Sequence, residues 1–159
     1  MITPIREIPA HTREMIHDDV AEVSDIERRS YEFPWSHGVF RDCLLAGYHC
    51  AVVEREGAVV GYSVLSIAAG DAHILNLCID PLYRELGYGE RLLDDILSAA
   101  RRDGVNEIFL EVRPSNEKAI ALYLKKGFRN IAYRPAYYQA NDGREDAAVF
   151  SKQLNKNPG

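Results

Sequence analysis

A strand, a glycine-containing loop and a helix in direct succession constrain the fold of this chain more than any other feature. The apolar run over residues 74–79 predicts a largely buried strand, and Asp80-Pro81 ends it because proline has no N–H group to give to a sheet. The loop Arg84–Gly89 follows and carries two glycines. Apolar side chains then recur at helical spacing, at Leu92, Leu93, Ile96, Leu97 and Ala100. Because glycines let a backbone approach closely and the N–H groups at a helix N-terminus favour an anion, this succession is typical of a phosphate site.

Two common phosphate loops do not match this stretch. A P-loop requires Lys followed by Ser or Thr after its last glycine, where this chain has Glu90-Arg91. The dinucleotide fingerprint requires a third glycine at the position of Leu92. What remains is an Arg-x-x-Gly-x-Gly pattern at Arg84, Gly87 and Gly89, which taken alone is also compatible with an ordinary turn.

Motifs elsewhere in the chain give that loop a context. In chain order they are Phe33-Pro34-Trp35-Ser36, Leu75-Asn76-Leu77 with Pro81, Phe109 to Asn116, Ala119 to Tyr123, Gly127-Phe128, Tyr137-Tyr138 and Gly143 to Ala147. With these motifs the chain resembles the GNAT superfamily of N-acetyltransferases, and within it the bacterial ribosomal-protein-alanine N-acetyltransferases of the RimI type. The order and spacing of the motifs hold from about residue 16 to residue 154, which is nearly the whole chain.

Length and composition predict a single N-acetyltransferase domain over residues 1–159, because a chain of this size buries one core. Residues 1–12 contain two prolines and no periodicity, so we expect a loose N-terminal arm there, and we expect a flexible tail at residues 155–159. No apolar run approaches the roughly 20 residues of a membrane span, and no secretory signal pattern is present. A cytoplasmic protein without membrane contact is therefore expected.

Charge and cysteine content narrow the range of partners. The formal net charge of −5 argues against direct nucleic-acid binding, which needs a basic surface. It is compatible with a basic protein substrate, or simply with solubility. The three cysteines form no CxxC pair and the five histidines show no ligand spacing, so neither a disulfide framework nor a metal site is indicated. A monomer is the favoured oligomeric state.

The pattern of the whole chain predicts an α+β fold. Asp19 and Glu22 are expected to form a capping box for a first helix, and Ser36 to cap a second. Strands are expected at residues 48–54, 58–67, 74–79, 108–113, 128–133 and 146–152, with helices at 89–103 and 116–127. Tyr137 and Tyr138 are expected in a long loop between the last two strands. The order is written ααββββαβαββ, which counts one early strand more than these ranges and allows for one or two early strands to be misjudged. It corresponds to the GNAT outline: a mixed, mostly antiparallel central sheet flanked by helices.

The resemblance implies acetyl transfer from acetyl-CoA to an amine. In the superfamily a pair of strands splays apart, and the freed backbone N–H groups bind the pantetheine arm and polarise the thioester carbonyl. At the matching positions these groups belong to Leu77, Cys78 and Ile79. The pyrophosphate is expected on the loop formed by Arg84, Glu85, Leu86, Gly87, Tyr88, Gly89 and Glu90. Asn116 matches a further CoA contact, although a helix N-cap explains this residue equally well.

Glu85 and Glu90 depart from the pattern of many relatives, which carry basic residues or glutamine there. Two carboxylates repel a pyrophosphate unless they point to solvent. Four arginines are candidates to compensate for them, namely Arg84, Arg91, Arg101 and Arg102.

Two residues match the catalytic positions that the resemblance implies. Glu111 is the candidate general base, and in an apolar cleft its pKa is expected to rise toward the working range. The residues alone favour a surface carboxylate paired with Arg113, and only the motif match supports the base. Tyr123 matches the position that protonates the departing thiolate, although a helix tyrosine is more often a core residue.

Aromatic residues are expected to bind the acceptor. Phe33, Pro34 and Trp35 on one side, and Tyr137 and Tyr138 on the other, are expected to form a slot for an extended peptide. Nearby carboxylates would favour a basic residue early in that peptide, among them Glu32, Glu145 and Asp146. The alternatives are that the first group is a hydrophobic plug and that the tyrosines staple a hairpin.

The leading hypothesis is transfer to the N-terminal α-amine of a basic ribosomal protein that begins with alanine. An α-amine has an ordinary pKa of about 8 and a lysine one of about 10.4, so much more of the α-amine is neutral at pH 7 and one modest base suffices. The nearest alternatives are other protein N-termini, lysines or a small amine. A different class of function, a non-catalytic acyl-CoA-binding or interaction module, is disfavoured by the presence of both Glu111 and Tyr123.

Overall fold

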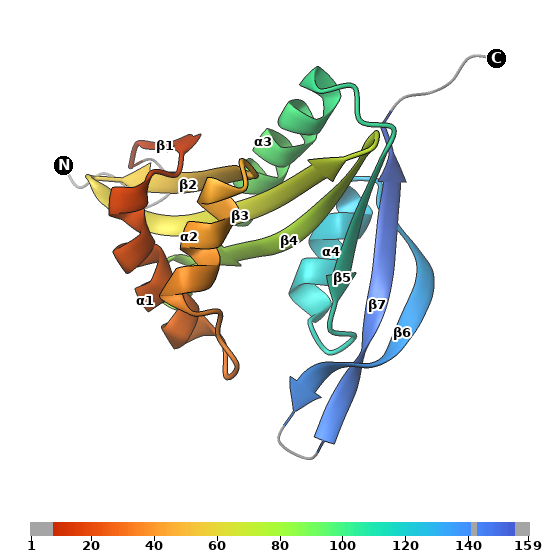
Figure 1. Cartoon of the computed structure of the whole chain (residues 1–159). Helices are drawn as coiled ribbons and strands as arrows, with labels where there is room; N and C mark the ends of the chain where they lie inside the picture. Colours follow the sequence, from red (N-terminus) through yellow and green to blue (C-terminus); the bar gives the residue numbers. More distant parts are fainter. Residues whose placement is uncertain (1–7, 141–142, 155–159) are drawn as a thin grey trace. The chain divides into compact units, whose positions relative to one another are not determined.

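The computed structural model describes residues 8–140 and 143–154 (Figure 1). The strands are β1 (Ala10–Glu14), β2 (His49–Arg55), β3 (Ala58–Ala68), β4 (Asp71–Ile79), β5 (Glu107–Val112), β6 (Arg129–Ala140) and β7 (Gly143–Gln153). The helices are α1 (Val20–Ser30), α2 (His37–Leu45), α3 (Tyr88–Arg102) and α4 (Glu117–Lys125), with short 3₁₀ helices η2 (His17–Asp19) and η3 (Pro81–Tyr83). The strand order in the sheet is β1-β2-β3-β4-β5-β7-β6.

The chain forms two compact units. The first contains the described residues up to Ser66 together with Asn76–Ala99. It includes α1, α2, β1, β2 and the glycine loop. The second contains Ile67–Leu75 together with the described residues from Ala100 onward. It includes β5, α4, β6 and β7, so the proposed phosphate loop and the proposed catalytic residues belong to different units.

In the first unit, the hairpin of β2 and β3 is covered by different helices on its two faces (Figure 1). Val60 belongs to a buried cluster with Tyr88 of α3, whereas the ring of Tyr62 meets Phe40 of α2 edge-on, with centroids 5.5 Å apart. Residues two apart in a regular strand share a face. The register shift at Val53 and Glu54 of β2 interrupts that regularity, so the side chains of Val60 and Tyr62 lie on opposite faces of the hairpin.

Strand β1 corrects the expectation of a loose arm over residues 1–12. Residues 10–12 belong to β1, which runs antiparallel to β2 with Ala10 opposite Arg55 and Glu14 opposite Ala51. The strand was not predicted because its burial does not alternate and because its stability comes from a partner 41 positions along the chain, through Arg13 and Glu54. Residues 1–7 and the expected tail at 155–159 lie outside the described residues.

The predicted capping box at the start of α1 is wrong. The Asp19 carboxylate accepts hydrogen bonds from both terminal nitrogens of Arg13, each at 2.8 Å, and from the Ile16 N–H, and it does not cap the helix. These hydrogen bonds hold the pKa of Asp19 below its usual value despite burial. Arg13 has the largest influence on that pKa. Glu22 instead accepts a hydrogen bond from the Val59 N–H at 3.2 Å. Both carboxylates are therefore engaged by partners that the local pattern does not specify.

Other local predictions are confirmed. Ser36 caps α2 by accepting a hydrogen bond from the Val39 N–H, and Phe40 and Cys43 of that helix are buried. Burial alternates along β5 as the sequence indicates. Gly127 follows α4 with a φ of +90°, the left-handed conformation that glycine adopts most readily.

The long loop predicted between the last two strands is mostly strand. β6 and β7 form a hairpin that pairs Tyr138 with Glu145 and Ala140 with Gly143. The register shifts between Arg134 and Tyr138, in a stretch that contains Pro135 and has Ala136 at a φ of +52°. A bulge of this kind accommodates a proline, because the proline has no N–H to pair. Asn141-Asp142, expected in the same loop, lies outside the described residues.

The predicted class, α+β with a mostly antiparallel sheet, is confirmed. The pairs β1–β2, β2–β3, β5–β7 and β6–β7 are antiparallel, and β4 runs parallel to β5 where Asp71–Ile74 lie beside Glu107–Leu110. The element order differs from the predicted one at a single point. The first strand precedes α1, whereas the prediction placed four strands after the second helix.

Candidate functional site

The glycine loop of the first unit lies between η3 and α3 and has a well-defined start. The Asp80 carboxylate accepts a hydrogen bond from the Leu82 N–H at 3.1 Å and one from Arg29 at 2.7 Å. Arg84 then donates from Nε to the Ile79 carbonyl at 3.3 Å, which turns the chain back toward the end of β4. The loop is thus held at its N-terminal end by polar contacts to α1 and β4.

The backbone of the loop suits an anion. Glu85 and Gly87 adopt left-handed conformations, with φ values of +64° and +89°, and a Cβ built at Gly87 meets no described atom within 4 Å. Open space above a glycine is what close approach of a phosphate requires. The helix α3 begins at Tyr88, and N–H groups in the first turn of a helix have no carbonyl partner within that helix. These residues therefore fit a pyrophosphate.

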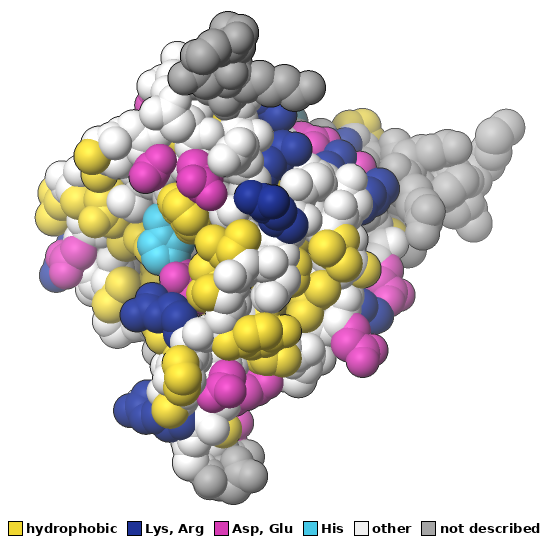
Figure 2. Space-filling view, turned by 90° about the vertical axis from the view of Figure 1, so that its right-hand side faces the viewer, with side chains coloured by type: hydrophobic (Ala, Val, Ile, Leu, Met, Phe, Trp, Pro, Cys, Tyr) yellow, Lys and Arg dark blue, Asp and Glu magenta, His cyan; other side chains and the backbone are white. Residues whose placement is uncertain are grey.

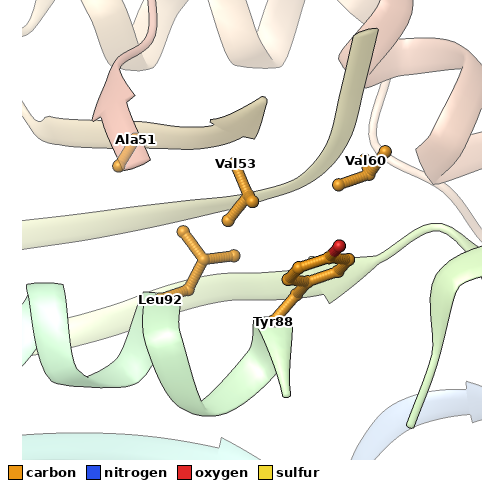
Figure 3. Packing of buried hydrophobic residues seen from close by; sticks show 5 residues of the cluster. All are labelled: Ala51, Val53, Val60, Tyr88 and Leu92. Atoms are coloured by element: carbon orange, nitrogen blue, oxygen red, sulfur yellow. The ribbon is translucent and has the colours of Figure 1, made fainter. Parts of the chain in front are cut away.

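Tyr88 fixes the end of the loop in the core of the first unit. Its ring lies in the same buried cluster as Val53 and Val60 of the β2–β3 hairpin and Leu92 of α3 (Figure 3). Tyr88 is 5% exposed, and Tyr83 and Leu86 pack against the cluster from the loop side. The sequence predicts this residue only as a pyrophosphate contact, and it missed the anchoring role of the side chain.

The charged side chains around the loop are arranged unevenly. Glu85 is exposed and Glu90 is half-buried. Arg84 and Arg91 are exposed beside them, and the guanidinium of Arg91 lies 5.9 Å from the centroid of the Tyr88 ring and donates to the Ala10 carbonyl. The other two arginines predicted to compensate, Arg101 and Arg102, lie at the opposite end of α3 from the loop. Only two of the four predicted arginines are therefore at the start of α3.

The β4 residues predicted to hold the thioester pack closely against β3. Cys78 is buried, and Leu77 and Ile79 are partly buried against the Tyr88 cluster. A Cβ built at Gly61 of β3 would meet the Cys78 carbonyl at 3.0 Å and the Ile79 side chain at 2.5 Å. Glycine at position 61 therefore permits the close approach of the two strands.

In the second unit Glu111 is the centre of a charged cluster. It lies on β5, and its side chain is 11% exposed. One carboxylate oxygen contacts His73 Nε2 of β4, and the other accepts a hydrogen bond from Arg134 of β6 at 3.3 Å. Figure 2 shows basic and acidic side chains interspersed with apolar ones on the face it presents. The predicted alternative, a pair with Arg113, is not what the structure shows.

The prediction that the Glu111 pKa is raised is wrong. Burial is the largest single influence and raises the pKa, but the hydrogen bonds and charges of His73 and Arg134 together outweigh it. The pKa of Glu111 is therefore lowered, and the carboxylate is ionised throughout the neutral range. A carboxylate in this state accepts a proton less readily than the sequence reasoning assumed.

Tyr123 lies in the core of the second unit. It is 7% exposed, and its ring packs on Phe128 and Phe150 with centroids 5.8 and 6.4 Å away. Burial raises the pKa of Tyr123 to about 12, so its hydroxyl carries a proton at neutral pH. Asn116 accepts a hydrogen bond from the Ala119 N–H at 3.2 Å and is the N-cap of the same helix. One of the two predicted explanations of Asn116 is thereby confirmed.

The aromatic residues predicted to bind an acceptor have different surroundings in the two units. The ring centroids of Tyr137 and Tyr138 on β6 lie 4.8 Å apart. A guanidinium lies 4.5 Å from the centroid of each ring, that of Arg134 over Tyr137 and that of Arg113 over Tyr138. Burial raises the pKa of both phenols. In the first unit Trp35 is half-buried and packs on Phe40 at 5.3 Å, while Phe33 and Pro34 are exposed.

The carboxylates predicted to favour a basic residue are partly engaged. Glu145 accepts hydrogen bonds from Arg113 and from Ser115, each at 3.0 Å. Asp146 accepts one from the Ala136 N–H at 2.8 Å, and Glu32 is exposed. Glu145 is thus already bound by a cation of its own unit.

Three residues of these clusters were not predicted: His73, Arg134 and Glu27, whose carboxylate accepts a hydrogen bond from the Trp35 N–H. His73 lies directly before the strand predicted over residues 74–79, and it contacts Glu111 because β4 and β5 pair in one particular register. No local signal in the sequence specifies that register. Within residues 8–140 and 143–154, no group of three or more His, Cys, Asp and Glu side chains is arranged to hold a metal ion. No described helix is long and apolar enough to cross a membrane.

Comparisons with known proteins match most of the chain. A family model described as the acetyltransferase (GNAT) family matches residues 20–128. A ribosomal protein bS18-alanine N-acetyltransferase from Escherichia coli K12 is 33% identical, over 84% of this chain and 90% of that protein. A putative enzyme of the same name from Bacillus subtilis is 34% identical, over 92% and 97% of the two chains.

Solved structures agree with these matches. The crystal structure of the ribosomal-protein-S18-alanine N-acetyltransferase from Escherichia coli superposes with a TM-score of 0.88 at 30% identity, covering 93% of this chain and 96% of that one. Ard1 from Thermoplasma volcanium superposes with a TM-score of 0.83 at 28% identity, covering 92% and 99%.

Proposed function

Since the chain belongs to the acetyltransferase (GNAT) family and is an N-acetyltransferase, we propose that it transfers an acetyl group from acetyl-CoA to the α-amine of a ribosomal protein that begins with alanine. The observation that supports this substrate is the similarity, over most of the chain, to enzymes named for that reaction. Family membership also confirms the GNAT fold expected from the sequence. A ribosomal substrate would place the reaction in the cytoplasm.

Acetyl-CoA supplies a thioester that an amine can attack. The N–H groups of the glycine loop, from Arg84 to Glu90, would hold the pyrophosphate, because the left-handed Gly87 and the start of α3 form an anion-binding backbone. The N–H groups of Leu77, Cys78 and Ile79 would hold the pantetheine arm and polarise the carbonyl. Asn116 would add a contact beyond its capping role.

The acceptor amine must lose a proton as it attacks. We assign that proton to the pair of His73 and Glu111. Glu111 is held ionised by His73 and Arg134, so it suits the role of orienting the imidazole and stabilising its positive charge. The pair can thus accept a proton that Glu111, with its lowered pKa, accepts poorly alone.

The departing thiolate must gain a proton. As the C–N bond forms and the C–S bond breaks, Tyr123 gives its hydroxyl proton to the sulfur. Its buried phenol is protonated at neutral pH, which is the state that a general acid requires. The amine proton ends on the His73–Glu111 pair, so the step is balanced.

Two groups of aromatic residues, one in each unit, are proposed separately as contacts for the acceptor peptide. Phe33, Pro34 and Trp35 in the first unit and Tyr137 and Tyr138 in the second would each contact it. Exposed Phe33 and half-buried Trp35 offer ring surface for an extended chain. Because Arg113 already binds Glu145, the preference for a basic residue would depend mainly on Glu32 and Asp146.

The test uses three acceptors with acetyl-CoA and the intact enzyme: an Ala-starting ribosomal peptide, the same peptide with its α-amine blocked, and a lysine peptide with a blocked N-terminus. A mass gain of one acetyl group on the first peptide alone is the expected result. Acetylation of the lysine peptide or of a small polyamine in preference to the first would favour the other acceptor classes. Release of no CoA with any acceptor, despite acetyl-CoA binding, would favour a non-catalytic binding module.

A further inference from the structure

We propose that Glu27 is a positioning residue that holds the Trp35 segment against the sheet of the first unit and so shapes the acceptor side of the site. The inference rests on the proposed function for its effect on catalysis, because that function assigns Trp35 to the acceptor. The positioning itself is independent of the function. None of the sequence motifs described above contains Glu27.

Glu27 is a buried carboxylate that gathers three donors from three segments. It lies on α1 and is 2% exposed. Its Oε1 accepts from the Tyr62 hydroxyl at 2.6 Å and from the Asn76 side-chain amide at 3.0 Å. Its Oε2 accepts from the backbone N–H of Trp35 at 2.9 Å. One carboxylate thus joins α1 to β3, to β4 and to the segment before α2.

The three donors explain why the residue is a glutamate. All three are neutral, and burying a carboxylate among neutral groups is costly unless both oxygens are satisfied. Glutamine would be cheaper to bury, but it has a single acceptor oxygen, and its amide NH₂ would face one of the three donors. Only a carboxylate accepts from Tyr62 and Asn76 on one oxygen and from Trp35 on the other.

The ring of Trp35 is held from the same place as its backbone. Its centroid lies 5.3 Å from that of the Phe40 ring, and the Phe40 centroid lies 5.5 Å from that of Tyr62. The ring of Trp35 is therefore connected through Phe40 to Tyr62, whose hydroxyl donates to Glu27. Burial, followed by the neighbouring Cys78 and Glu27, raises the pKa of Tyr62, which keeps this hydroxyl a donor. Trp35 itself remains half-buried, so part of its ring stays available to a ligand.

Docking of α1 does not by itself explain Glu27. Arg29, two residues further along α1, binds Asp80 at 2.7 Å and already ties the helix to the end of β4. What Glu27 adds is the link from Trp35 to Asn76, the residue directly before the β4 segment assigned to the thioester. Glu27 therefore connects the proposed acceptor wall to the proposed thioester strand.

Trp35 is the only tryptophan of the chain, so its fluorescence reports on the proposed positioning directly. The experiment compares wild type, Glu27→Gln, Tyr62→Phe and the matched control Arg29→Ala. It measures acrylamide quenching of Trp35, thermal unfolding, and KM for peptide and for acetyl-CoA. Arg29→Ala removes a polar contact from α1 to Asp80, directly after β4, and does not alter the contacts of Trp35.

Glu27→Gln is expected to increase quenching severalfold and to raise the peptide KM by about tenfold, with little change in the KM of acetyl-CoA. Tyr62→Phe should give a smaller change in the same direction. Arg29→Ala, which also loosens the start of the glycine loop, should lower stability and raise the KM of acetyl-CoA while quenching and the peptide KM stay unchanged. Equal quenching and equal peptide KM in Glu27→Gln and Arg29→Ala would overturn the proposal. Increased quenching with an unchanged peptide KM would keep the positioning and reject the assignment of Trp35 to the acceptor.

Hydrogen exchange in the wild-type protein provides a test that requires no variant. The Trp35 amide lies outside a regular helix or strand, so only its bond to Glu27 accounts for protection. Slow exchange at Trp35 is expected. Exchange as fast as that of an exposed loop amide would contradict the proposal even if Glu27→Gln fails to fold.

Discussion

The glycine loop of the first unit and the charged cluster of the second unit are built from different chemical groups. The loop presents backbone N–H groups, and its conformation includes the left-handed residues Glu85 and Gly87. The cluster consists of side chains alone, in which Glu111 acquires its properties from His73 and Arg134. A backbone site depends on conformation at a few positions, whereas a side-chain site depends on which strands pair and in which register. Substitutions that change backbone conformation should therefore affect the loop most, whereas substitutions that remove a charged side chain should affect the cluster most.

The largest effect is expected for a change of backbone conformation in the loop. Gly87→Val forces a β-branched residue into a φ of +89° and fills the space above the loop, so acetyl-CoA affinity should fall by about 10²-fold. Glu85→Gln should change that affinity by far less, or improve it. Calorimetry on both variants measures the contrast.

Gly57→Val is the matched control for strain. Gly57 has a φ of +82° and equally open surroundings, but it lies in the β2–β3 turn. It should lose stability like Gly87→Val and still bind acetyl-CoA. Unchanged affinity in Gly87→Val, or equal losses in both variants, would show that the loop is an ordinary turn.

Substitution of Glu111 should have the next largest effect. Glu111→Gln should lower kcat by about 10²-fold, because the variant can no longer stabilise the charged imidazole of His73. The loss should be smaller at high pH, where more of the amine is already neutral. A pH–rate profile measures this, and Glu107→Gln on the same strand is the control.

The pairing of His73 with Glu111 predicts strong non-additivity. His73→Gln should lower kcat, and the double variant should be scarcely slower than Glu111→Gln alone, because the two residues act as a unit. Additive losses in the cycle would separate the two residues and leave Glu111 as an independent base.

Much of the difference between the two sites is also a difference in what the sequence can predict. Gly87, Ser36 and Gly127 act through their own backbone or that of the next few residues, so local spacing reveals them. Glu111 and Tyr123 were identified by resemblance, but the direction of the Glu111 pKa was wrong because its partner His73 is 38 positions away.

Glu27 and the β6–β7 hairpin show the same limit. Glu27 receives its donors from positions 8, 35 and 49 residues away, and no periodicity specifies such a set. The sequence predicts a loop around Pro135, where the structure has a bulge in which the two strands stay paired on either side. Long-range register decides these contacts, and it becomes visible only in the folded chain.

A smaller effect is expected at Tyr123. Tyr123→Phe retains the ring and its contacts with Phe128 and Phe150, so the unfolding temperature should hold while kcat falls roughly tenfold. Tyr133→Phe, at an exposed tyrosine of β6, is the control and should change neither quantity. Full activity in Tyr123→Phe would assign thiolate protonation to solvent and leave Tyr123 as a core residue.

The smallest effect, and the finest test of a site made from side chains, concerns Arg134. Its hydrogen bond and charge help to lower the Glu111 pKa, but they contribute less than those of His73, and Arg134 is half exposed. Arg134→Gln should let the pKa of Glu111 rise, because burial then meets less opposition. The Glu111 carboxylate is ionised only above its pKa, so a higher pKa means that it becomes protonated at a higher pH as the pH falls. The acid limb of the kcat profile should therefore move to higher pH. Activity at neutral pH should change little. Arg129→Gln on the same strand should leave the limb in place, and added salt should weaken the difference between wild type and Arg134→Gln. An acid limb that is identical in the two proteins would mean that His73 alone sets the charge of Glu111.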